Sequence, residues 1–542
     1  MIYIGVFWIL IGFVLYPAFN TFISSLKSQD GLTLKYYKDF FSNKNNITVV
    51  INTIKLGIAT VLVCGVIGTG LAFYVNYFDF PYNNIINKLL LTPIMIPGVI
   101  IVIAFIQLYG ESGLITSTIE LLFNLNKHPY DFKGFYGILF IHAYTQYVYF
   151  YLNVSVSIGY IDYSTIEAAK NLGASKLKIF TSVILPTITP ALATSSILTF
   201  MSGIGSFSAP NLLGHNYKVL STQILLAKTN NYMEIASVQV MILLFTGLVF
   251  LTLLRHYERS TKMEMSVKGK AIKPVKIKDP KKRKIYMALA GFIILTIILP
   301  ILTIFLLSFV KPGTWMINIY PKEFGLDNYI KIFTKSRVFA PFKNSISMSL
   351  WATFFSLILG VPCAYIINKT KFKAKGILEL LVILPWAMPA STIAINMING
   401  FNKPNIFVGN NILVGTYILL PLAYFVGIIP LMVKTTGVSL NNLNNTLIDA
   451  SKTLGASWKN TFKKIIIPII SPGIIAGAVL GFIRCVGEYT TSALLYGVAN
   501  KPISIAMVNA LYEFEIGLSM AYGVLIIVIT SLLASLMLKL RK

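Results

Sequence analysis

Two charged residues lie in an otherwise apolar stretch of the C-terminal half. Arg484 and Glu488 are one helical turn apart within the apolar run 474–495. At this i, i+4 spacing they can pair on one face of a helix. An ionisable side chain within an apolar span is by default a functional candidate. Two interpretations therefore remain open: an ion pair that orients the helix, or a carboxylate, Glu488, that lines a transport pathway or its gate.

A related polar run occurs 282 residues earlier. Ser202 and Ser206 take the positions of Arg484 and Glu488, and in both runs a glycine leads into polar residues and an aromatic, Phe207 or Tyr489. Such a run breaks an apolar helix, and a membrane tolerates broken backbone only where protein or a watery cavity covers it. We therefore expect these positions to lie along a translocation path or gate.

Other residues that could carry chemistry are scattered. Three cysteines, Cys64, Cys363 and Cys485, lie far apart in apolar stretches, and the histidines show no ligand spacing. The pattern indicates buried thiols and predicts no metal site. His142 stands alone in a span, where a packed, hydrogen-bonded side chain is expected. The phosphate-binding pattern G-x-x-x-x-G-K-[ST] does not occur in the sequence. We therefore expect a non-enzymatic chain with no cofactor of its own.

The elements that must position these residues are long apolar segments. Of 542 residues, 56% are hydrophobic and 12% charged, which excludes a soluble enzyme. A bilayer core about 30 Å thick needs about 20 mostly apolar residues. Segments of this kind are 2–23, 49–75, 89–108, 136–156, 190–207, 238–254, 285–310, 345–367, 377–397, 412–433, 474–495 and 521–538. The sequence predicts an all-α, polytopic membrane protein with about twelve transmembrane helices.

The charge distribution predicts the orientation of these spans. The chain has 46 Lys and Arg against 19 Asp and Glu, a net charge of +27. Twelve basic residues fall in the one long polar stretch, 255–284, which the positive-inside bias places in the cytoplasm. Alternating sides from there puts both termini in the cytoplasm. Most of the excess charge then lies in cytoplasmic segments, so it reports orientation and does not indicate nucleic-acid binding.

The chain also contains an internal repeat. Residues 167–175 recur as 449–457, and each copy reaches a proline, Pro186 or Pro468, at the same distance. Other landmarks agree, for Asn52-Thr53 corresponds to Asn344-Ser345 and the pair Pro93/Pro97 corresponds to Pro385/Pro389. We therefore expect a first transmembrane domain at 1–254, a basic cytoplasmic linker at 255–284 and a second transmembrane domain at 285–542. Six spans is an even number, so the halves form two parallel six-helix repeats, which favours a transporter with a pathway between them.

The repeated loop falls in cytoplasmic segments between the fourth and fifth spans of each half. Its residues predict a short helix that starts at an acid, a turn that glycine permits, and a proline at the entry to the next helix. The positions are Glu167, Ala168, Ala169, Gly173 and Pro186 in the first half, and Asp449, Ala450, Ser451, Gly455 and Pro468 in the second. The loop is either a structural hairpin at the membrane surface or a docking element for a cytoplasmic partner.

This loop resembles the EAA loop of ABC importer permeases. The first copy matches the family pattern from Glu167 to Pro186, whereas the second departs from it with Asp449, Ser451 and Ile467, all mild changes. The resemblance covers nearly the whole chain because the six-span unit occurs twice. It implies that each loop forms a coupling helix that sits in a cleft of an ATP-binding subunit.

The resemblance further implies the partners and the location of the chain. Two copies of a cytoplasmic ATP-binding subunit would hold ATP and Mg, an external binding protein would deliver the substrate, and the chain would lie in the bacterial inner membrane as a multi-pass protein. The run 205–214 looks most like the ferric-iron group of these permeases. Ferric iron is therefore the first expectation, and thiamine, polyamine, phosphonate and oxyanion permeases are the alternatives.

Rivals outside this family fit less well. A secondary carrier would place coupling residues in several spans, but only Arg484 and Glu488 qualify. An intramembrane enzyme would need a convergent nucleophile or acid–base cluster. A non-transporting membrane scaffold would leave the twofold loop unexplained.

Overall fold

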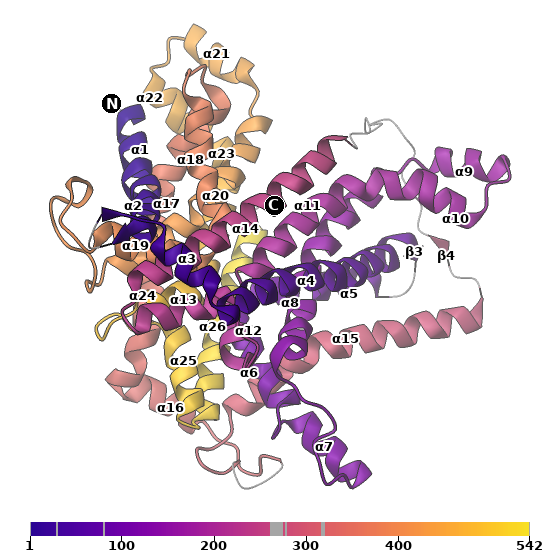
Figure 1. The fold of residues 1–542 in the computed structure, drawn as a ribbon. Helices are drawn as coiled ribbons and strands as arrows, with labels where there is room; N and C mark the ends of the chain where they lie inside the picture. Colours follow the sequence, from indigo (N-terminus) through magenta and orange to yellow (C-terminus); the bar gives the residue numbers. More distant parts are fainter. Residues whose placement is uncertain are drawn as a thin grey trace. The chain divides into compact units, whose positions relative to one another are not determined.

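The computed structural model describes residues 2–28, 31–79, 82–260, 275–276, 279–315 and 320–540, and almost every element is a helix (Figure 1). The helices up to residue 260 are α1 (Ile2–Leu10), α2 (Tyr16–Leu26), α3 (Lys35–Ser42), α4 (Lys44–Tyr77), α5 (Asn83–Leu90), α6 (Gly98–Tyr109), α7 (Leu114–Phe123), α8 (Gly134–Ile158), α9 (Tyr163–Asn171), α10 (Lys176–Ile179), α11 (Leu185–Ile204), α12 (Ser208–Leu213), α13 (Leu220–Thr229) and α14 (Met233–Ser260).

The remaining helices are α15 (Pro280–Ser308), α16 (Asp327–Thr334), α17 (Ser336–Lys369), α18 (Lys375–Ala387), α19 (Ala390–Phe401), α20 (Leu419–Asn442), α21 (Asn445–Thr453), α22 (Trp458–Thr461), α23 (Ile467–Val486), α24 (Thr490–Leu495), α25 (Ile503–Tyr512) and α26 (Ile516–Leu540). Four two-residue strands pair as β1 (Lys27–Ser28) with β2 (Gly31–Leu32), antiparallel, and β3 (Phe78–Asp79) with β4 (Val275–Lys276), parallel. The predicted all-α fold is confirmed. Most of the predicted linker, 261–274 and 277–278, lies outside the described residues.

Each predicted span has a counterpart among these helices. Within the described ranges, ten helices are long and apolar enough to cross a bilayer, or eleven if the bent pair α18 and α19 forms one span. The one remaining predicted span, 136–156, corresponds to α8, which is long enough but carries His142, Gln146 and Asn153 among its apolar residues. These polar side chains lower its hydropathy below that of a typical lipid-exposed helix.

Prolines account for the two broken spans. In the first half, Pro97 stands between the 3₁₀ turn Thr92–Met95 and α6. In the second half, Pro389 separates α18 from α19, and the two helices meet at a bend of 113°. Proline removes a backbone donor and disfavours helical geometry in the residue before it. The sequence predicted spans at both places, and the structure breaks them there.

The described chain packs as two compact units. One comprises Met1–Ser42, Gln223–Met241 and Ile304–Lys542, and the other comprises Asn43–Thr222 and Ile242–Thr303. The predicted domains follow the sequence repeat, whereas these units follow packing. They differ because the first helix of each half packs among helices of the other half.

In the first of these units, α2 lies against α19. In the π-helical turn Ile11–Leu15 just before α2, the ring of Phe13 lies 5.4 Å from that of Phe401, centroid to centroid. The Asn399 amide donates to the hydroxyls of Thr21 (3.2 Å) and Ser237 (2.9 Å). A Cβ atom on Gly400 would lie 2.9 Å from Pro17, so this helix crossing requires glycine.

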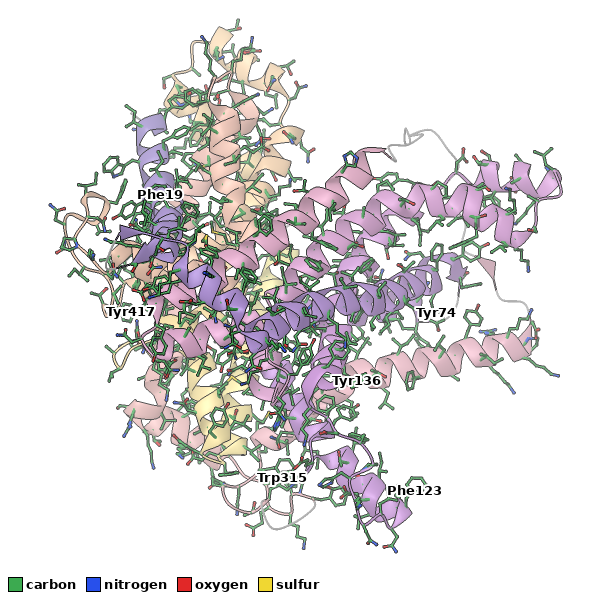
Figure 2. All side chains as sticks on the ribbon, in the orientation of Figure 1. Phe19, Tyr74, Phe123, Tyr136, Trp315 and Tyr417 are labelled. Carbon is green, nitrogen blue, oxygen red and sulfur yellow. The ribbon has the colours of Figure 1, made fainter. Side chains whose placement is uncertain are left out.

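In the other unit, α15 packs against α4 and α8. Tyr74, labelled in Figure 2, stacks on Tyr286 with ring centroids 5.7 Å apart and donates its hydroxyl to the carbonyl of Tyr286 at 2.7 Å. The Tyr144 hydroxyl donates to the Ile297 carbonyl at 2.9 Å. These tyrosine contacts attach the first helix of the second half to the first half.

Candidate functional site

The first repeated loop is built by a capped helix and a glycine turn. The Asp162 side chain accepts a hydrogen bond from the backbone of Ser164 at 2.9 Å and so caps the start of α9. At the other end, Gly173 adopts φ +76° and donates to the Lys170 carbonyl at 2.9 Å, and Ala174 donates to the Ala169 carbonyl at 3.0 Å. This pair of bonds is the Schellman ending, which favours glycine at the left-handed position.

The second loop has the same geometry. The Asn444 side chain caps α21, Gly455 adopts φ +73° and donates to the Lys452 carbonyl at 2.9 Å, and Ala456 donates to the Ser451 carbonyl at 3.1 Å. A Cβ atom on Gly173 or Gly455 would meet nothing within 4 Å. Backbone conformation alone therefore requires glycine within this chain, and the space beside each turn is open.

Each loop leads into its membrane helix through a π-helical turn. The turns are Phe180–Ile184 and Phe462–Ile466, and the residue after each donates to the carbonyl five positions earlier. Pro186 and Pro468 follow directly, within the first two residues of α11 and α23. Proline has no N–H, so the helix cannot keep its regular i→i−4 hydrogen bonds there. The wider π-helical turn pairs the neighbouring backbone N–H and carbonyl groups instead.

The loops present one anchored face and one exposed face. Ile166 and Ile448 are buried, which holds α9 and α21 in place. The following leucines point outward, for Leu172 is 88% exposed and Leu454 is 86% exposed. Glu167, Ala168, Asp449 and Ala450 are exposed as well, and Asp449 lies 3.5 Å from the Lys452 ammonium. The predicted coupling residues on the surface of the loops are thus Glu167, Ala168, Gly173, Asp449, Ala450 and Gly455. Ala169 is half-buried and Ser451 is buried.

Ser451, which departs from the family pattern, has a buried partner. Its hydroxyl lies 2.7 Å from the hydroxyl of Thr461, and both side chains are buried. The equivalent first-half positions are Ala169 and Ile179, which belong to one hydrophobic cluster. A polar pair in one loop therefore replaces an apolar pair in the other.

Glu488 caps a helix and forms no close ion pair with Arg484. Its two carboxylate oxygens accept hydrogen bonds from the backbone of Thr491 and Ser492, both at 3.0 Å, at the start of α24. In the described ranges, Arg484 and Glu488 form no salt bridge within 4 Å. α23 ends at Val486, so the two residues do not share a continuous helix, and Arg484 is exposed. The possible i, i+4 ion pair is absent for this reason.

Ser206 belongs to a buried hydrogen-bond network. His142 on α8 lies 2.8 Å from the Ser206 hydroxyl through Nε2 and 2.8 Å from the Thr60 hydroxyl through Nδ1. His142 is thus packed and hydrogen-bonded, as the sequence predicted. Phe207 is buried and Ser202 is half-buried at the end of α11, so the first-half candidates gather at one broken helix end.

The second half repeats this network with different residues. Tyr424 on α20 stands 282 positions after His142, and its hydroxyl lies 2.6 Å from the Ser492 hydroxyl. The carbonyl of Ser206 accepts from Ser221 at 2.6 Å, and that of Glu488 accepts from Ser504 at 2.7 Å. The fourth span of each half therefore fixes the polar segment after the fifth. Tyr489 is buried beside this segment.

The repeated pairs Asn52-Thr53 and Asn344-Ser345 hold the chain that follows each polar segment. Asn52 donates to the Lys218 carbonyl and Asn344 to the Lys501 carbonyl, both at 3.1 Å. The hydroxyl of the second residue in each pair accepts a hydrogen bond from a backbone N–H. Thr53 accepts from Leu220 at 2.9 Å, and Ser345 accepts from Ile503 at 2.8 Å. The sequence marked these pairs as landmarks of the repeat, but their partners, far away in the chain, were not predictable from spacing.

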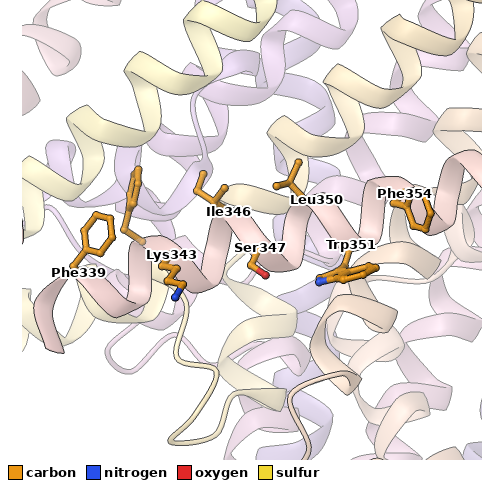
Figure 3. Close-up of a pocket in the computed structure, with 8 residues that line it drawn as sticks. Phe339, Lys343, Ile346, Ser347, Leu350, Trp351 and Phe354 are labelled. Carbon is orange, nitrogen blue, oxygen red and sulfur yellow. The ribbon is translucent and has the colours of Figure 1, made fainter. Parts of the chain in front are cut away.

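A hollow of about 750 Å³ runs along α17 (Figure 3). Its lining is almost entirely apolar and comes from this single helix, between Phe339 and Phe354. An exposed apolar face on a membrane span is typical of a lipid-facing surface. None of the predicted site residues lines it.

The described part of the chain holds no group of three or more His, Cys, Asp or Glu side chains that could bind a metal ion. Cys64, Cys363 and Cys485 are buried and unpaired with one another. The predicted site residues thus form two surface loops and two polar helix breaks.

Comparison of the sequence with known proteins finds the same two-part organisation. The family described as "Binding-protein-dependent transport system inner membrane component" matches residues 63–263 and again residues 356–541, which confirms the internal repeat. A probable ABC transporter permease of Sinorhizobium fredii is 31% identical over 467 residues, 84% of this chain and 81% of that protein.

Two further relatives differ in what their names say they transport. The ferric transport system permease FbpB of Actinobacillus pleuropneumoniae is 22% identical over 530 residues, 95% of this chain and 74% of that protein. The spermidine/putrescine transport system permease PotB of Escherichia coli is 31% identical over 225 residues, 40% of this chain and 80% of that protein.

Proposed function

Since this chain belongs to the family of binding-protein-dependent transport system inner membrane components, we propose that it forms the whole membrane pathway of an ABC importer and imports ferric iron. An external binding protein delivers the cargo, and ATP hydrolysis on two copies of a separate cytoplasmic subunit drives its passage. ATP and Mg bind to that subunit and not to this chain. Both termini and the basic linker face the cytoplasm.

The observation that carries the coupling role is the exposure of Leu172 and Leu454. A large apolar side chain that projects from a capped, glycine-ended turn is poised to enter a cleft of a partner. The two turns have the same backbone geometry and the same outward leucine. Two equal surfaces suit two copies of one ATP-binding subunit. Glu167 and Asp449, with the neighbouring small residues, complete each contact surface.

The proposal of ferric iron rests on the resemblance of the run 205–214, on a relative and on one residue. The ferric permease FbpB corresponds to nearly the whole chain, including both halves, and Glu488 supplies a carboxylate of the kind that a cation favours near its path. A polyamine is the second candidate, because PotB is more similar in sequence over the part that it covers. Ser202, Ser206, Phe207, Arg484, Glu488 and Tyr489 are the proposed residues of the path or gate.

A co-purification experiment tests the coupling role. The permease is expressed with the ATP-binding subunit encoded beside it, as wild type, as Leu172→Asp/Leu454→Asp, and as Leu32→Asp. Leu32 is 78% exposed and lies on β2, outside both loops, so it is a matched control. We expect the double variant to lose the ATP-binding subunit and the control to keep it. Retention of the subunit and of uptake by the double variant would refute the docking role.

A further inference from the structure

The two halves differ in the helix that forms the second part of each broken third span. α6, in the first half, is apolar along most of its length, with Val99, Ile100 and Ala104 buried. Pro97 and Pro389 align the repeats here, so the equivalent positions on α19 are Ser391, Thr392 and Asn396.

These three side chains on α19 are buried but incompletely bonded. Ser391 and Thr392 are fully buried and Asn396 is 4% exposed. Ser391 Oγ, Thr392 Oγ1 and Asn396 Oδ1 have no hydrogen-bond partner among the described residues. Burying a polar atom without a partner is unfavourable, and each such atom in a folded protein calls for an explanation. In the described part of the first half, α6 has no buried side-chain atom that lacks a hydrogen-bond partner.

The polar positions form one face of α19. Thr392, Asn396 and Asn399 stand at i, i+4 and i+7, so they share a side of the helix. Only the last is satisfied, by the hydroxyls of Thr21 and Ser237. At the other two positions the oxygens lack partners within the described chain: Thr392 Oγ1 accepts and donates nothing, and Asn396 donates only its amide nitrogen, to the Met388 sulfur at 3.6 Å.

Glu488, the acid among the proposed path residues, binds the element beside α19. α19 packs against α24, the short helix that Glu488 caps. Its carboxylate oxygens have further lone pairs beyond the two backbone bonds that they accept. Arg484, on α23, is exposed and is not part of α24. Hydroxyl, amide and carboxylate oxygens are the ligands that hard cations take, and they also accept hydrogen bonds from ammonium groups.

We propose that the face of α19 formed by Thr392 and Asn396, with Ser391, is a cargo-contacting surface specific for a cation and confined to the second half. The inference rests on the proposed transport function. The side-chain oxygens that are buried and unpartnered here would receive a cation, or its water, when the transporter opens. Neutral oxygens bind a passing cation weakly enough to release it. The shared chemistry fits a ferric ion and the ammonium groups of a polyamine.

Uptake into proteoliposomes tests this proposal. The permease, its ATP-binding subunit and its binding protein are reconstituted, and uptake of radiolabelled ferric iron, putrescine and sulfate is measured in separate arms. The variants are Thr392→Val, Asn396→Leu and their combination, which remove oxygens without adding charge. Thr353→Val is the matched control, because Thr353 on α17 is also buried and unpartnered but lies on another helix. Thermal unfolding and ATP-binding-subunit association are recorded for every variant.

We expect wild type to take up one of the two cations, and the double variant to take it up about tenfold more slowly at limiting concentration. Thr353→Val should match wild type, and no variant should be less stable or lose the ATP-binding subunit. Unchanged uptake by the double variant would overturn the inference and leave the transport function intact. Sulfate as the transported cargo would overturn it as well. Absence of ATP-driven uptake by wild type would instead refute the proposed function, and the inference with it.

Discussion

The hydroxyls of Ser451 and Thr461 lie 2.7 Å apart inside the second repeated loop. At the equivalent positions the first loop has Ala169 and Ile179, so the two loops reach the same turn with a polar pair in one and an apolar pair in the other. Because both members change together, the departure of Ser451 from the EAA pattern is compensated within the chain.

Thr461→Ile alone should be more harmful than the exchange of both residues. It removes the partner of the buried Ser451 hydroxyl and should lower stability by about 1–3 kcal/mol. Ser451→Ala/Thr461→Ile copies the first half and should recover most of the loss. Thermal unfolding of the purified permease measures this coupling as a double-mutant cycle. Additive effects of the two single changes would show that the pair is not coupled.

Replacement of the turn glycines should act through the backbone alone. At φ +76° and +73°, with open space for a Cβ, Gly173→Val and Gly455→Val should each cost about 1–2 kcal/mol in the isolated permease. Asparagine tolerates this conformation, so Gly173→Asn and Gly455→Asn are the controls. Thermal unfolding gives the comparison. If the asparagine variants were as unstable as the valine variants, backbone conformation would not be the reason for glycine.

Glu488 should stabilise α24 without help from Arg484. Glu488→Ala removes both acceptors of the cap and should lower stability by about 1 kcal/mol, with Glu488→Gln in between because it keeps one acceptor oxygen. Arg484→Met should stay within about 0.5 kcal/mol of wild type, since Arg484 is exposed and forms no close salt bridge in the described ranges. Equal losses for Arg484→Met and Glu488→Ala would instead support an ion pair.

Tyr424→Phe should loosen the polar segment of the second half while keeping its packing. The change removes only the hydroxyl that lies 2.6 Å from Ser492, at a cost of about 1 kcal/mol. Hydrogen exchange over 487–495 should then become faster, whereas exchange over the equivalent first-half segment should not change. Equal exchange rates in variant and wild type would show that Tyr424 does not hold this segment.

Much of this architecture could be predicted from the sequence because it depends on local patterns. Apolar length predicts the spans, and the recurrence of Gly173 at Gly455 and of Pro186 at Pro468 predicts a repeated turn and helix entry. These features need only the residues that form them. The same holds for His142, whose isolation in a span predicted a packed, hydrogen-bonded side chain.

Long-range pairing could not be predicted in this way. An apolar helix such as α2 carries no local signal that its partner is α19, nearly 380 residues away. The spacing of Arg484 and Glu488 predicted a possible ion pair, but Gly487 ends the helix between them and the carboxylate binds backbone donors instead. The sequence marked Pro389 only as a landmark of the repeat, whereas the bend of 113° depends on how α18 and α19 pack.

ATP-driven uptake by the reconstituted complex tests the central claim most directly. Proteoliposomes that contain the permease and its ATP-binding subunit are loaded with ATP or with a non-hydrolysable analogue, and radiolabelled ferric iron is supplied outside on the binding protein. The account predicts accumulation inside only with hydrolysable ATP, and its loss in Leu172→Asp/Leu454→Asp at unchanged permease stability. Equal accumulation with both nucleotides, or full uptake by that double variant, would contradict it.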